Sequence, residues 1–175
     1  MLRLRPYKAC DAHQIITWIK DEFSFRQWCA DRFEAYPITA KMMNEHYDAA
    51  AENDSFWQMT AFDESGVTGH FIMRFTDLKK NVVRFGFVIL NDKMRGQGLG
   101  KEMLKLALDY SFRILKVDKV TLGVFDNNPS AFHCYKSVGF REVESRGEVY
   151  QVLGETWNCI EMEISKEDRF ELHIH

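Results

Sequence analysis

The sequence predicts an α/β protein built around one mixed β-sheet, and three observations lead to this expectation. A chain of 175 residues has the length of one ordinary domain, and a domain of that size buries about 70% of its unfolded surface around a single core. Strand-like segments follow one another directly in the middle of the chain and then alternate with helical segments. No repeat, linker or low-complexity block divides the chain, so we expect one domain over residues 1–175.

The composition is typical of a soluble globular protein. Hydrophobic residues make up 46% of the chain and charged residues 28%, which argues against a disordered or fibrous chain. The formal net charge of -3 gives no basic surface for nucleic acid, although mild acidity suits a cationic acceptor. No window approaches the ~18 apolar residues that a membrane span requires, and the opening residues lack the apolar run of a secretory signal. We therefore expect a cytoplasmic protein that binds neither nucleic acid nor membrane.

The cysteine and histidine residues show no metal-binding pattern. The four cysteines lie far apart and form no CxxC pair, so buried free thiols are expected. The chain ends in "HIH", but no HExxH or comparable framework accompanies it. We expect no metal site, and a C-terminal tail that frays from about residue 166.

The N-terminal segments predict one strand and two helices. The alternating segment "LRLRPY" indicates a strand. Asp11 then offers an N-cap with Gln14 three residues later, as in a capping box, which predicts a helix from about Ala12 to Glu22. The next segment, "FSFRQWCADRFEAYP", is aromatic and irregular. A second helix is expected after Thr39, because apolar residues there recur along one stripe.

The central and C-terminal segments predict most of the sheet. "SFWQMTAF", "VTGHFIMRF" and "NVVRFGFVIL" indicate three strands joined by polar turns, which form an antiparallel meander. Beyond a glycine-rich stretch, the apolar residues between Met103 and Ser111 recur at helical spacing and predict a helix with one buried face. "DKVTLGVF" indicates a buried strand and "NPSAFHCYKSV" a short helix ended by Gly139. "EVYQVL" and "WNCIEMEI" indicate a final pair of strands.

The glycine-rich stretch "NDKMRGQGLGKEM" separates a predicted strand from the amphipathic helix. In this order, backbone N–H groups of the loop and of the helix N-terminus can surround an anion. Glycine permits positive φ angles, and without a Cβ it lets a phosphate approach the backbone closely. Arg95 stands at the start of the loop and adds a cation. The stretch therefore predicts a site for a diphosphate.

Two common nucleotide-binding motifs do not fit this spacing. A Walker A loop requires GxxxxGK followed by Ser or Thr, whereas three residues separate Gly96 from Gly100 and Glu102 follows the lysine. The dinucleotide fingerprint requires GxGxxG near the start of a βαβ unit, whereas this loop has the spacing GxGxG and follows a meander. The diphosphate is therefore expected to belong to another cofactor.

Two motifs together resemble one known family, the GNAT superfamily of acyl-CoA-dependent N-acyltransferases. The pattern Arg-x-x-Gly-x-Gly from Arg95 to Gly100 resembles the loop that binds the coenzyme A pyrophosphate in that family. The segment "VFDNNPSAFHCYKSVGF" is similar to the second cofactor motif, where Asn128 and Ala131 match Asn-x-x-Ala and Tyr135 matches the tyrosine that follows. The opening segment is similar to the branch that includes acetylases of ribosomal-protein N-termini. The resemblance covers nearly the whole chain.

The resemblance implies a mostly antiparallel sheet with flanking helices and a V-shaped splay between its two central strands. Backbone groups left unpaired by the splay must find other partners, and the pantetheine arm of coenzyme A can supply them as an added pseudo-strand. Acetyl-CoA is the implied cosubstrate, with no metal. The residues expected to bind it are Phe87, Val88, Ile89, Leu90, Arg95, Gly96, Gln97, Gly98, Leu99, Gly100, Lys101, Asn128, Ala131 and Tyr135.

The resemblance also implies direct attack of an acceptor amine on the thioester, through a tetrahedral intermediate. Tyr135 is the expected proton donor to the departing thiolate, because a phenol of pKa ~10 is protonated at neutral pH. A backbone N–H near Val88 or Ile89 is expected to polarise the thioester carbonyl. The acceptor is expected to be a primary amine of a small molecule or a peptide, and a homodimer is left open.

The general base stays unassigned. Many relatives carry a glutamate at positions that here are Arg84 and Gly123, and neither residue is a base at pH 7. An acceptor that arrives already neutral is one alternative. The candidates for a base acting through ordered water are Asp126, His133, Glu142 and Glu155.

Three further questions stay open on the sequence. The missing glutamates favour a module that binds acyl-CoA without turning it over. A nucleotide-dependent phosphotransferase would use the same glycine loop, although the Walker spacing argues against it. The aromatic run from Phe23 to Tyr36 lies where the family builds the acceptor side of its cleft, and it either lines a pocket or packs into the core.

Overall fold

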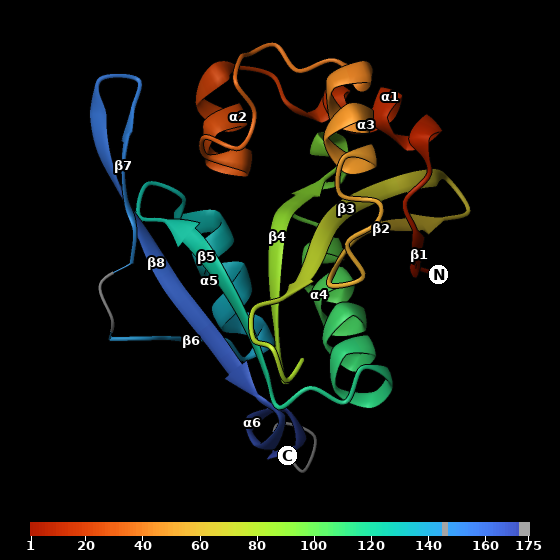
Figure 1. The fold of residues 1–175 in the computed structure, drawn as a ribbon, viewed down its shortest axis with the longest axis vertical. Helices are drawn as coiled ribbons and strands as arrows, with labels where there is room; N and C mark the ends of the chain where they lie inside the picture. Colours follow the sequence, from red (N-terminus) through yellow and green to blue (C-terminus); the bar gives the residue numbers. More distant parts are fainter. Residues whose placement is uncertain (145–146, 172–175) are drawn as a thin grey trace.

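A mixed eight-stranded β-sheet forms the centre of the molecule (Figure 1). The computed structural model describes residues 1–144 and 147–171. Every neighbouring pair of strands is antiparallel except β4 and β5, which confirms the mixed, mostly antiparallel sheet. In spatial order the strands are β1 (Arg3–Pro6), β2 (Phe56–Asp63), β3 (Gly66–Phe75), β4 (Val82–Leu90), β5 (Lys119–Phe125), β8 (Glu155–Ser165) and β6 (Arg141–Glu142), with β7 (Val149–Val152) paired to β8.

Helices lie on both faces of this sheet and bury two separate cores against it (Figure 1). One core lies beneath α4 and α5, and the other lies beneath α1, α2 and α3. A helix covering each face is the arrangement that buries both apolar surfaces of a sheet. The helices are α1 (Ala12–Ile15), α2 (Glu22–Cys29), α3 (Ala40–Asp48), α4 (Leu99–Asp109), α5 (Pro129–Val138) and α6 (Lys166–Glu171).

The expected amphipathic helix after the glycine loop is confirmed as α4. Its predicted stripe is buried, with Met103 and Leu108 each 0% exposed. Ser111, the last residue of the stripe, is also buried, and its hydroxyl donates to the Ala107 carbonyl at 2.8 Å. Helical periodicity was sufficient to predict this helix and its buried face, because one face of α4 packs along the sheet.

The single helix expected from Ala12 to Glu22 is wrong. The helix α1 ends at Ile15, a 3-10 turn follows, and Ile19 is extended with a φ of -97°. A new helix, α2, begins at Glu22 and occupies the start of the segment that we expected to be irregular. Its N-cap is Asp21, whose carboxylate accepts from the Ser24 N–H at 2.7 Å.

The capping-box pattern suggested that the Asp11 side chain caps α1. In the structure, this side chain makes no capping hydrogen bond to α1. The Asp11 carboxylate accepts two hydrogen bonds from the Arg5 guanidinium at 2.7 and 2.8 Å and one from the Thr60 hydroxyl at 2.8 Å. These contacts tie the start of α1 to β1 and β2. Tertiary partners therefore replaced the local cap that the sequence indicated.

The two central strands separate as expected. β4 pairs with β5 only from Val82–Lys119 to Arg84–Thr121, and beyond that point the strands diverge toward the end of the sheet that carries α2 (Figure 1). We call this gap the β4–β5 opening. It confirms the V-shaped splay and leaves the second half of β4 without a strand partner on that side.

A bulge in β4 redirects the side chains along the opening. The register between β3 and β4 shifts opposite His70 and Ile72, and Phe87 has a positive φ of 49°. Before the bulge, Phe85 belongs to the core beneath α4. After it, Phe87 belongs to the core beneath α1 to α3. An extra residue in one strand has this effect because successive side chains normally point to opposite faces.

The C-terminal segment differs from the frayed tail that we expected. Residues Lys166–Glu171 form α6, while "HIH" at 173–175 lies outside the described residues. Among the described residues, no group of three or more His, Cys, Asp or Glu side chains is arranged to hold a metal ion. Within the same residues, no helix has the length and apolar character needed to cross a membrane.

Candidate active site

The glycine loop joins β4 to α4 at the edge of the opening. Gly96 and Gly98 have φ angles of 77° and 81°, a region that side chains other than glycine rarely adopt. Gly98 is also the N-cap of α4. A Cβ on Gly100 would lie 2.9 Å from Leu90 Cδ1, so this glycine allows α4 to pack closely against the end of β4.

The backbone of this loop has free donors for an anion. Within the described residues, the N–H groups from Arg95 to Lys101 have no hydrogen-bond acceptor. The side chains of Arg95, Gln97 and Lys101 are exposed around them. Successive N–H groups at a helix N-terminus, with cations beside them, fit a diphosphate. The loop residues therefore suit the pyrophosphate of coenzyme A.

The second motif forms the start of α5 and carries Tyr135. The Asn128 side chain accepts from the Ala131 N–H at 3.2 Å, so these two residues cap the helix. Gly139 ends α5 with a φ of 114°. The capping role explains why Asn and a small residue stand three positions apart. It also fixes where Tyr135 emerges, two turns along the helix.

Tyr135 is buried, and its ring packs near Phe140 with centroids 6.2 Å apart. Burial raises the pKa of Tyr135, and the charge of Cys134 adds to this effect. The phenol is therefore protonated throughout the neutral range. Its hydroxyl makes no hydrogen bond to any residue that the structure describes, so its role as proton donor stays a prediction.

The β4 backbone is partly occupied by α2. The Trp28 indole N–H donates to the Phe87 carbonyl at 2.9 Å, so this carbonyl is taken by the protein itself. Trp28 in turn stacks on Phe33 with an interplanar angle of 10°. Of the four β4 residues expected to meet the cofactor, Phe87 therefore already has one lone pair of its carbonyl occupied. The expected donors at Val88 and Ile89 stay a prediction.

Arg84 and Gly123, the positions without the expected glutamates, lie beside a carboxylate from a third strand. The Arg84 guanidinium donates to both oxygens of Glu161 on β8, at 2.7 and 2.9 Å. Gly123 on β5 pairs with Glu161 and lies between the two charged residues. Sequence reasoning missed Glu161, because the signal was only a charge on an exposed-looking strand position.

Each of the other candidate bases either accepts a hydrogen bond from another side chain or is exposed on the surface. The Asp126 carboxylate accepts from the Asn158 amide at 2.9 Å. Glu155 accepts from the Trp157 indole at 3.1 Å. Glu142 is exposed on β6, and His133 is exposed on α5. Glu161 is the carboxylate that the structure brings to the narrow end of the opening.

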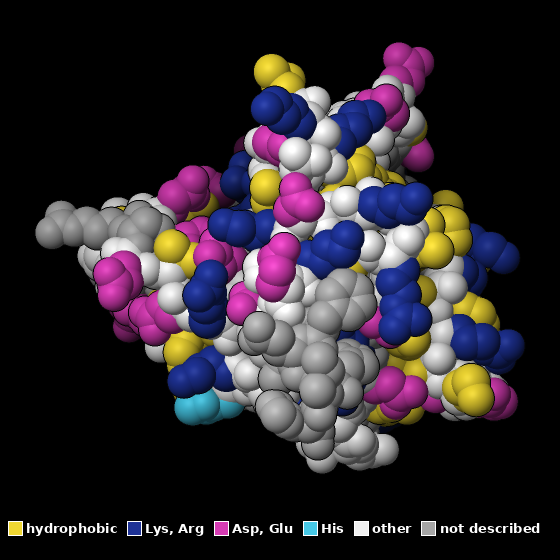
Figure 2. All heavy atoms as spheres, turned by 90° about the horizontal axis from the view of Figure 1, so that it is seen from below, with side chains coloured by type: hydrophobic (Ala, Val, Ile, Leu, Met, Phe, Trp, Pro, Cys, Tyr) yellow, Lys and Arg dark blue, Asp and Glu magenta, His cyan; other side chains and the backbone are white. Residues whose placement is uncertain are grey.

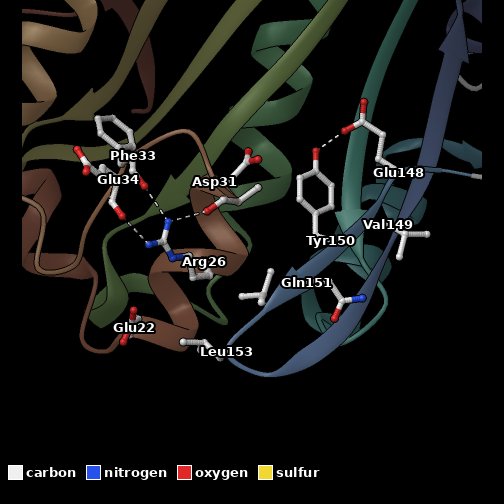
Figure 3. A pocket seen from close by; sticks show the side chains of 12 residues that line it. Glu22, Arg26, Asp31, Phe33, Glu34, Glu148, Val149, Tyr150, Gln151 and Leu153 are labelled. Carbon is white, nitrogen blue, oxygen red and sulfur yellow. Dashed lines mark hydrogen bonds between the residues drawn. The ribbon is translucent and has the colours of Figure 1, made fainter.

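A cavity of about 780 Å³ lies between α2 and the hairpin of β7 and β8 (Figure 3). Arg26 lies on the α2 side, opposite Tyr150 on the hairpin, whose hydroxyl donates to Glu148. We call this hollow the α2–β7 cavity. Its walls are formed by Glu22, Arg26, Ala30, Asp31, Phe33, Glu34, Glu148, Val149, Tyr150, Gln151, Val152 and Leu153.

The α2–β7 cavity is acidic. Four carboxylates line it, while its one lining cation, Arg26, donates to the carbonyls of Ala30, Phe33 and Glu34 at 2.7 to 3.1 Å. The carboxylates are exposed. Those carbonyls fix the guanidinium against the loop after α2, so the remaining surface attracts cations.

The aromatic run is mainly core, although one member faces the cavity. Phe25 is 0% exposed within the core beneath α1 to α3. Phe23 is 42% exposed and packs on Trp157, with ring centroids 5.0 Å apart. Phe33 lines the α2–β7 cavity and stacks on Trp28. One short segment thus contributes both to the cavity and to the contact with the β4 bulge.

A family comparison agrees with this geometry. Residues 1–141 match the model of the acetyltransferase (GNAT) domain, so the chain belongs to the GNAT family. It is an acetyltransferase that uses acetyl-CoA as its cosubstrate. The family excludes the phosphotransferase alternative and gives no support to a binding module without turnover.

Several characterised relatives that match this chain are polyamine acetyltransferases. Spermidine N(1)-acetyltransferase of Escherichia coli (strain K12) is 23% identical over 162 residues, which cover 92% of this chain and 84% of that protein. Spermine/spermidine N(1)-acetyltransferase of Bacillus subtilis (strain 168) is 30% identical over 79 residues, or 43% of this chain and 52% of that protein. The finer likeness to ribosomal-protein acetylases, suggested by the opening segment, is therefore not confirmed.

The fold is shared with a solved structure from the same group. The crystal structure of spermidine N-acetyltransferase from Vibrio cholerae in complex with CoA and spermine superposes with a TM-score of 0.82. The match covers 97% of this chain and 98% of that chain at 22% sequence identity. At this identity the similarity establishes the fold, and the acceptor must be argued from this chain's own residues.

Proposed function

We propose that this protein acetylates a primary amine of a polyamine such as spermidine or spermine. The observation that carries the proposal is the carboxylate-lined α2–β7 cavity, whose wall residue Phe33 contacts Phe87 of β4 with ring centroids 5.7 Å apart. A polyamine is an elongated chain of ammonium groups separated by methylenes. The cavity offers matching chemistry, with four carboxylates and the apolar surfaces of Phe33, Val152 and Leu153.

The similarity to polyamine acetyltransferases supports the same acceptor. Relatives of that activity match over most of this chain. A peptide acceptor would instead require a groove that accepts a backbone as well as a terminal amine. A small polycation needs only spaced negative charges and a route to the thioester. In this proposal, the carboxylates of the α2–β7 cavity supply the charges and the β4–β5 opening supplies the route.

In this proposal, each half of the site handles one reactant. The loop from Arg95 to Lys101 binds the pyrophosphate of acetyl-CoA, and the free edge of β4 holds the pantetheine arm. An N–H at Val88 or Ile89 stabilises the oxyanion of the tetrahedral intermediate. Tyr135 protonates the departing thiolate. The acceptor enters from the α2–β7 cavity on the opposite face.

Release of free thiol from acetyl-CoA, measured with a panel of amines, tests the proposed acceptor. The panel contains spermidine, spermine, propylamine and an amino acid. We expect kcat/KM for spermidine to exceed that for propylamine at least tenfold, because only the polyamine can occupy several carboxylates at once. The difference should shrink at high salt, since exposed charges are screened.

A cavity variant links the activity to the structure. The double substitution Asp31→Asn and Glu34→Gln should raise the KM for spermidine about tenfold, or ~1.4 kcal/mol, and leave the affinity for acetyl-CoA unchanged. Glu52→Gln, at an exposed position that does not line the cavity, is the matched control. Equal rates with propylamine and spermidine, or a cavity variant with unchanged KM, would contradict a polyamine acceptor.

A further inference from the structure

The Arg84–Glu161 ion pair lies at the narrow end of the β4–β5 opening. Arg84 is the last β4 residue that pairs with β5. Glu161 reaches it from β8, on the far side of β5, and each side chain is 24% exposed. The pair is therefore sheltered, but part of each side chain is still accessible to solvent.

Gly123 makes this contact across β5 feasible. A Cβ at Gly123 would lie 2.8 Å from Arg84 Nη2 and 2.6 Å from Cys159 Sγ. Contacts this short do not occur for real side chains, so any larger residue would displace the guanidinium. The glycine thus leaves the space in which charges from β4 and β8 meet over β5.

The pair points to the face that the acceptor would reach. Val83 and Phe85, on either side of Arg84, belong to the core beneath α4, so Arg84 projects to the other face of the sheet. Met162 belongs to that same core, so Glu161 beside it also projects away from α4. Tyr135, by contrast, comes from α5 on the α4 side. The two groups therefore approach the opening from opposite faces.

The pair is also continuous with the α2–β7 cavity. The Glu161 carboxylate lies 3.8 Å from Cys159 Sγ. The Cys159 N–H donates to the carbonyl of Glu148 at 2.9 Å, and Glu148 lines the cavity. A chain of direct contacts thus leads from the cavity wall to the narrow end of the opening.

We propose that Glu161 is the acceptor-side carboxylate of the acetyl transfer. It binds the reacting ammonium and takes its proton, while Arg84 holds the carboxylate in position. The proposal rests on the proposed function, because it requires an amine acceptor. A carboxylate offers about four lone-pair sites. The two bonds from Arg84 occupy two of them, and the weaker bond from the Cys159 thiol occupies a third. The fourth can accept from an ammonium that arrives from the cavity.

The proton balance closes with groups already named. The ammonium loses one proton to Glu161, which passes it to solvent. The neutral nitrogen forms a bond to the acetyl carbon, and the C–S bond then breaks as the thiolate takes a proton from Tyr135. The second proton lost by the nitrogen restores Tyr135. The net products are the acetylated amine, free coenzyme A and one proton.

Glu161→Gln removes the proton acceptor and keeps the shape of the side chain. We expect kcat/KM for spermidine at pH 7 to fall at least tenfold, and to recover toward the wild-type value by about pH 9.5, where more of the acceptor is already neutral. The affinity for acetyl-CoA should change less than threefold. Glu163→Gln is the matched control. Glu163 lies on β8, as Glu161 does, and forms ion pairs with Lys119 on β5 and Arg141 on β6. Its activity should stay within twofold of wild type.

Glu161→Gln also leaves the Arg84 charge unpaired. A second variant therefore distinguishes Glu161 as proton acceptor from Glu161 as the counter-charge of Arg84. Arg84→Gln with Glu161→Gln removes both charges at once. If Glu161 only neutralises Arg84, the double variant regains activity to within twofold at pH 7, and the proposal is overturned. If Glu161 takes the proton, the double variant stays slow at pH 7 and recovers with rising pH.

Other charged and titratable groups near Glu161 could also affect the pH dependence of kcat/KM. These are Arg84 on β4, Arg74 on β3, Cys159 on β8 and Glu148 before β7. Burial raises the pKa of the Cys159 thiol to about 11, and the arginines stay charged throughout the range. A profile unchanged in Glu161→Gln would therefore remove Glu161 from the reaction.

The acceptor panel keeps this proposal distinct from the proposed function. If spermidine is not acetylated but another amine is, the polyamine proposal fails and the Glu161 comparison is made with that amine. If spermidine is acetylated equally well by wild type and Glu161→Gln, only the Glu161 proposal fails. If the wild-type protein acetylates no amine, both are overturned.

Discussion

Tyr135 combines two properties that rarely occur together, because its ring is part of the core while its hydroxyl is unpaired. Burial among Val124, Phe140 and their neighbours fixes the ring. The raised pKa keeps the proton on the oxygen at every pH at which the protein is expected to work. A fixed, protonated and unpaired hydroxyl is what a general acid requires.

Tyr135→Phe should lower turnover at least tenfold and change the affinity for coenzyme A by no more than a few-fold. The substitution removes the proton donor and keeps the ring that packs in the core. Steady-state thiol release and calorimetric binding of coenzyme A measure the two effects. Tyr110→Phe, another partly buried tyrosine beyond the end of α4, is the control. Unchanged turnover in Tyr135→Phe would remove Tyr135 from the acid role.

Trp28 contacts the β4 bulge through one hydrogen bond and through a ring contact with Phe87, whose centroid lies 5.0 Å away. Phe87 holds a φ of 49°, and a bulky residue in this region costs about 1–3 kcal/mol unless its surroundings compensate. The indole N–H supplies one compensating contact at the Phe87 carbonyl. Trp28→Phe should therefore loosen the bulge and lower kcat at least fivefold, with a smaller effect on the KM for acetyl-CoA.

Trp57→Phe provides the comparison for this prediction. The Trp57 indole N–H is buried and has no partner among the described residues, so its removal loses no hydrogen bond. Both variants lose an indole and keep an aromatic ring. Equal kcat values for the two variants would show that ring size matters and the hydrogen bond to Phe87 does not.

At the scale of elements, the N-terminus of α4 depends on glycine conformation. Gly98→Ala places a side chain at a φ of 81°, although a Cβ there would meet no atom within 4 Å. The cost, on the order of 1–2 kcal/mol, would come from backbone strain alone. The loop should relax away from the geometry that binds a diphosphate, and affinity for coenzyme A should fall about fivefold to tenfold in calorimetry.

Gly66→Ala is the matched substitution in another part of the fold. Gly66 also has a positive φ, at 114°, and open space around its Cβ position, but it is the first residue of β3, directly after the turn from β2. It should lose a similar amount of stability and retain its affinity for coenzyme A. A similar loss of affinity in both variants would mean that strain weakens the whole fold and the loop has no special role.

At the scale of the whole molecule, stability should depend on pH through His70. His70 is 0% exposed, its Nε2 lies 2.7 Å from the Tyr47 hydroxyl, and burial lowers its pKa to about 3. In the unfolded chain a histidine titrates near pH ~6.5. Because the folded pKa is depressed, the stabilisation is complete above pH ~6.5 and is lost as the pH falls toward 3.

Chemical denaturation at pH 7.5 and 5.5 measures this effect above the range in which Asp11 titrates. The free energy of unfolding should fall by about 1.4 kcal/mol from His70 alone. His46, whose pKa burial also lowers, should add a smaller loss. His70→Gln cannot be protonated, so the difference between the two pH values should shrink in this variant. An unchanged difference would assign the acid sensitivity to other groups.

The sequence by itself determined the features that depend on neighbouring residues. The glycine loop, the capped helix that carries Tyr135 and the buried stripe of α4 follow from φ requirements, caps and helical periodicity, and each was predictable. The meander and the family signature were predictable for the same reason, because their signals lie within short windows. These features make up the proposed cofactor side of the site.

Only the tertiary structure decided the proposed acceptor side. The indole bond from Trp28 to Phe87 and the acidic cavity between α2 and β7 both join segments far apart in the chain. Glu161 meets Arg84 across 77 residues of sequence, through a space left by Gly123. Their positions depend on how strands pair and diverge, and no local pattern of residues specifies that register.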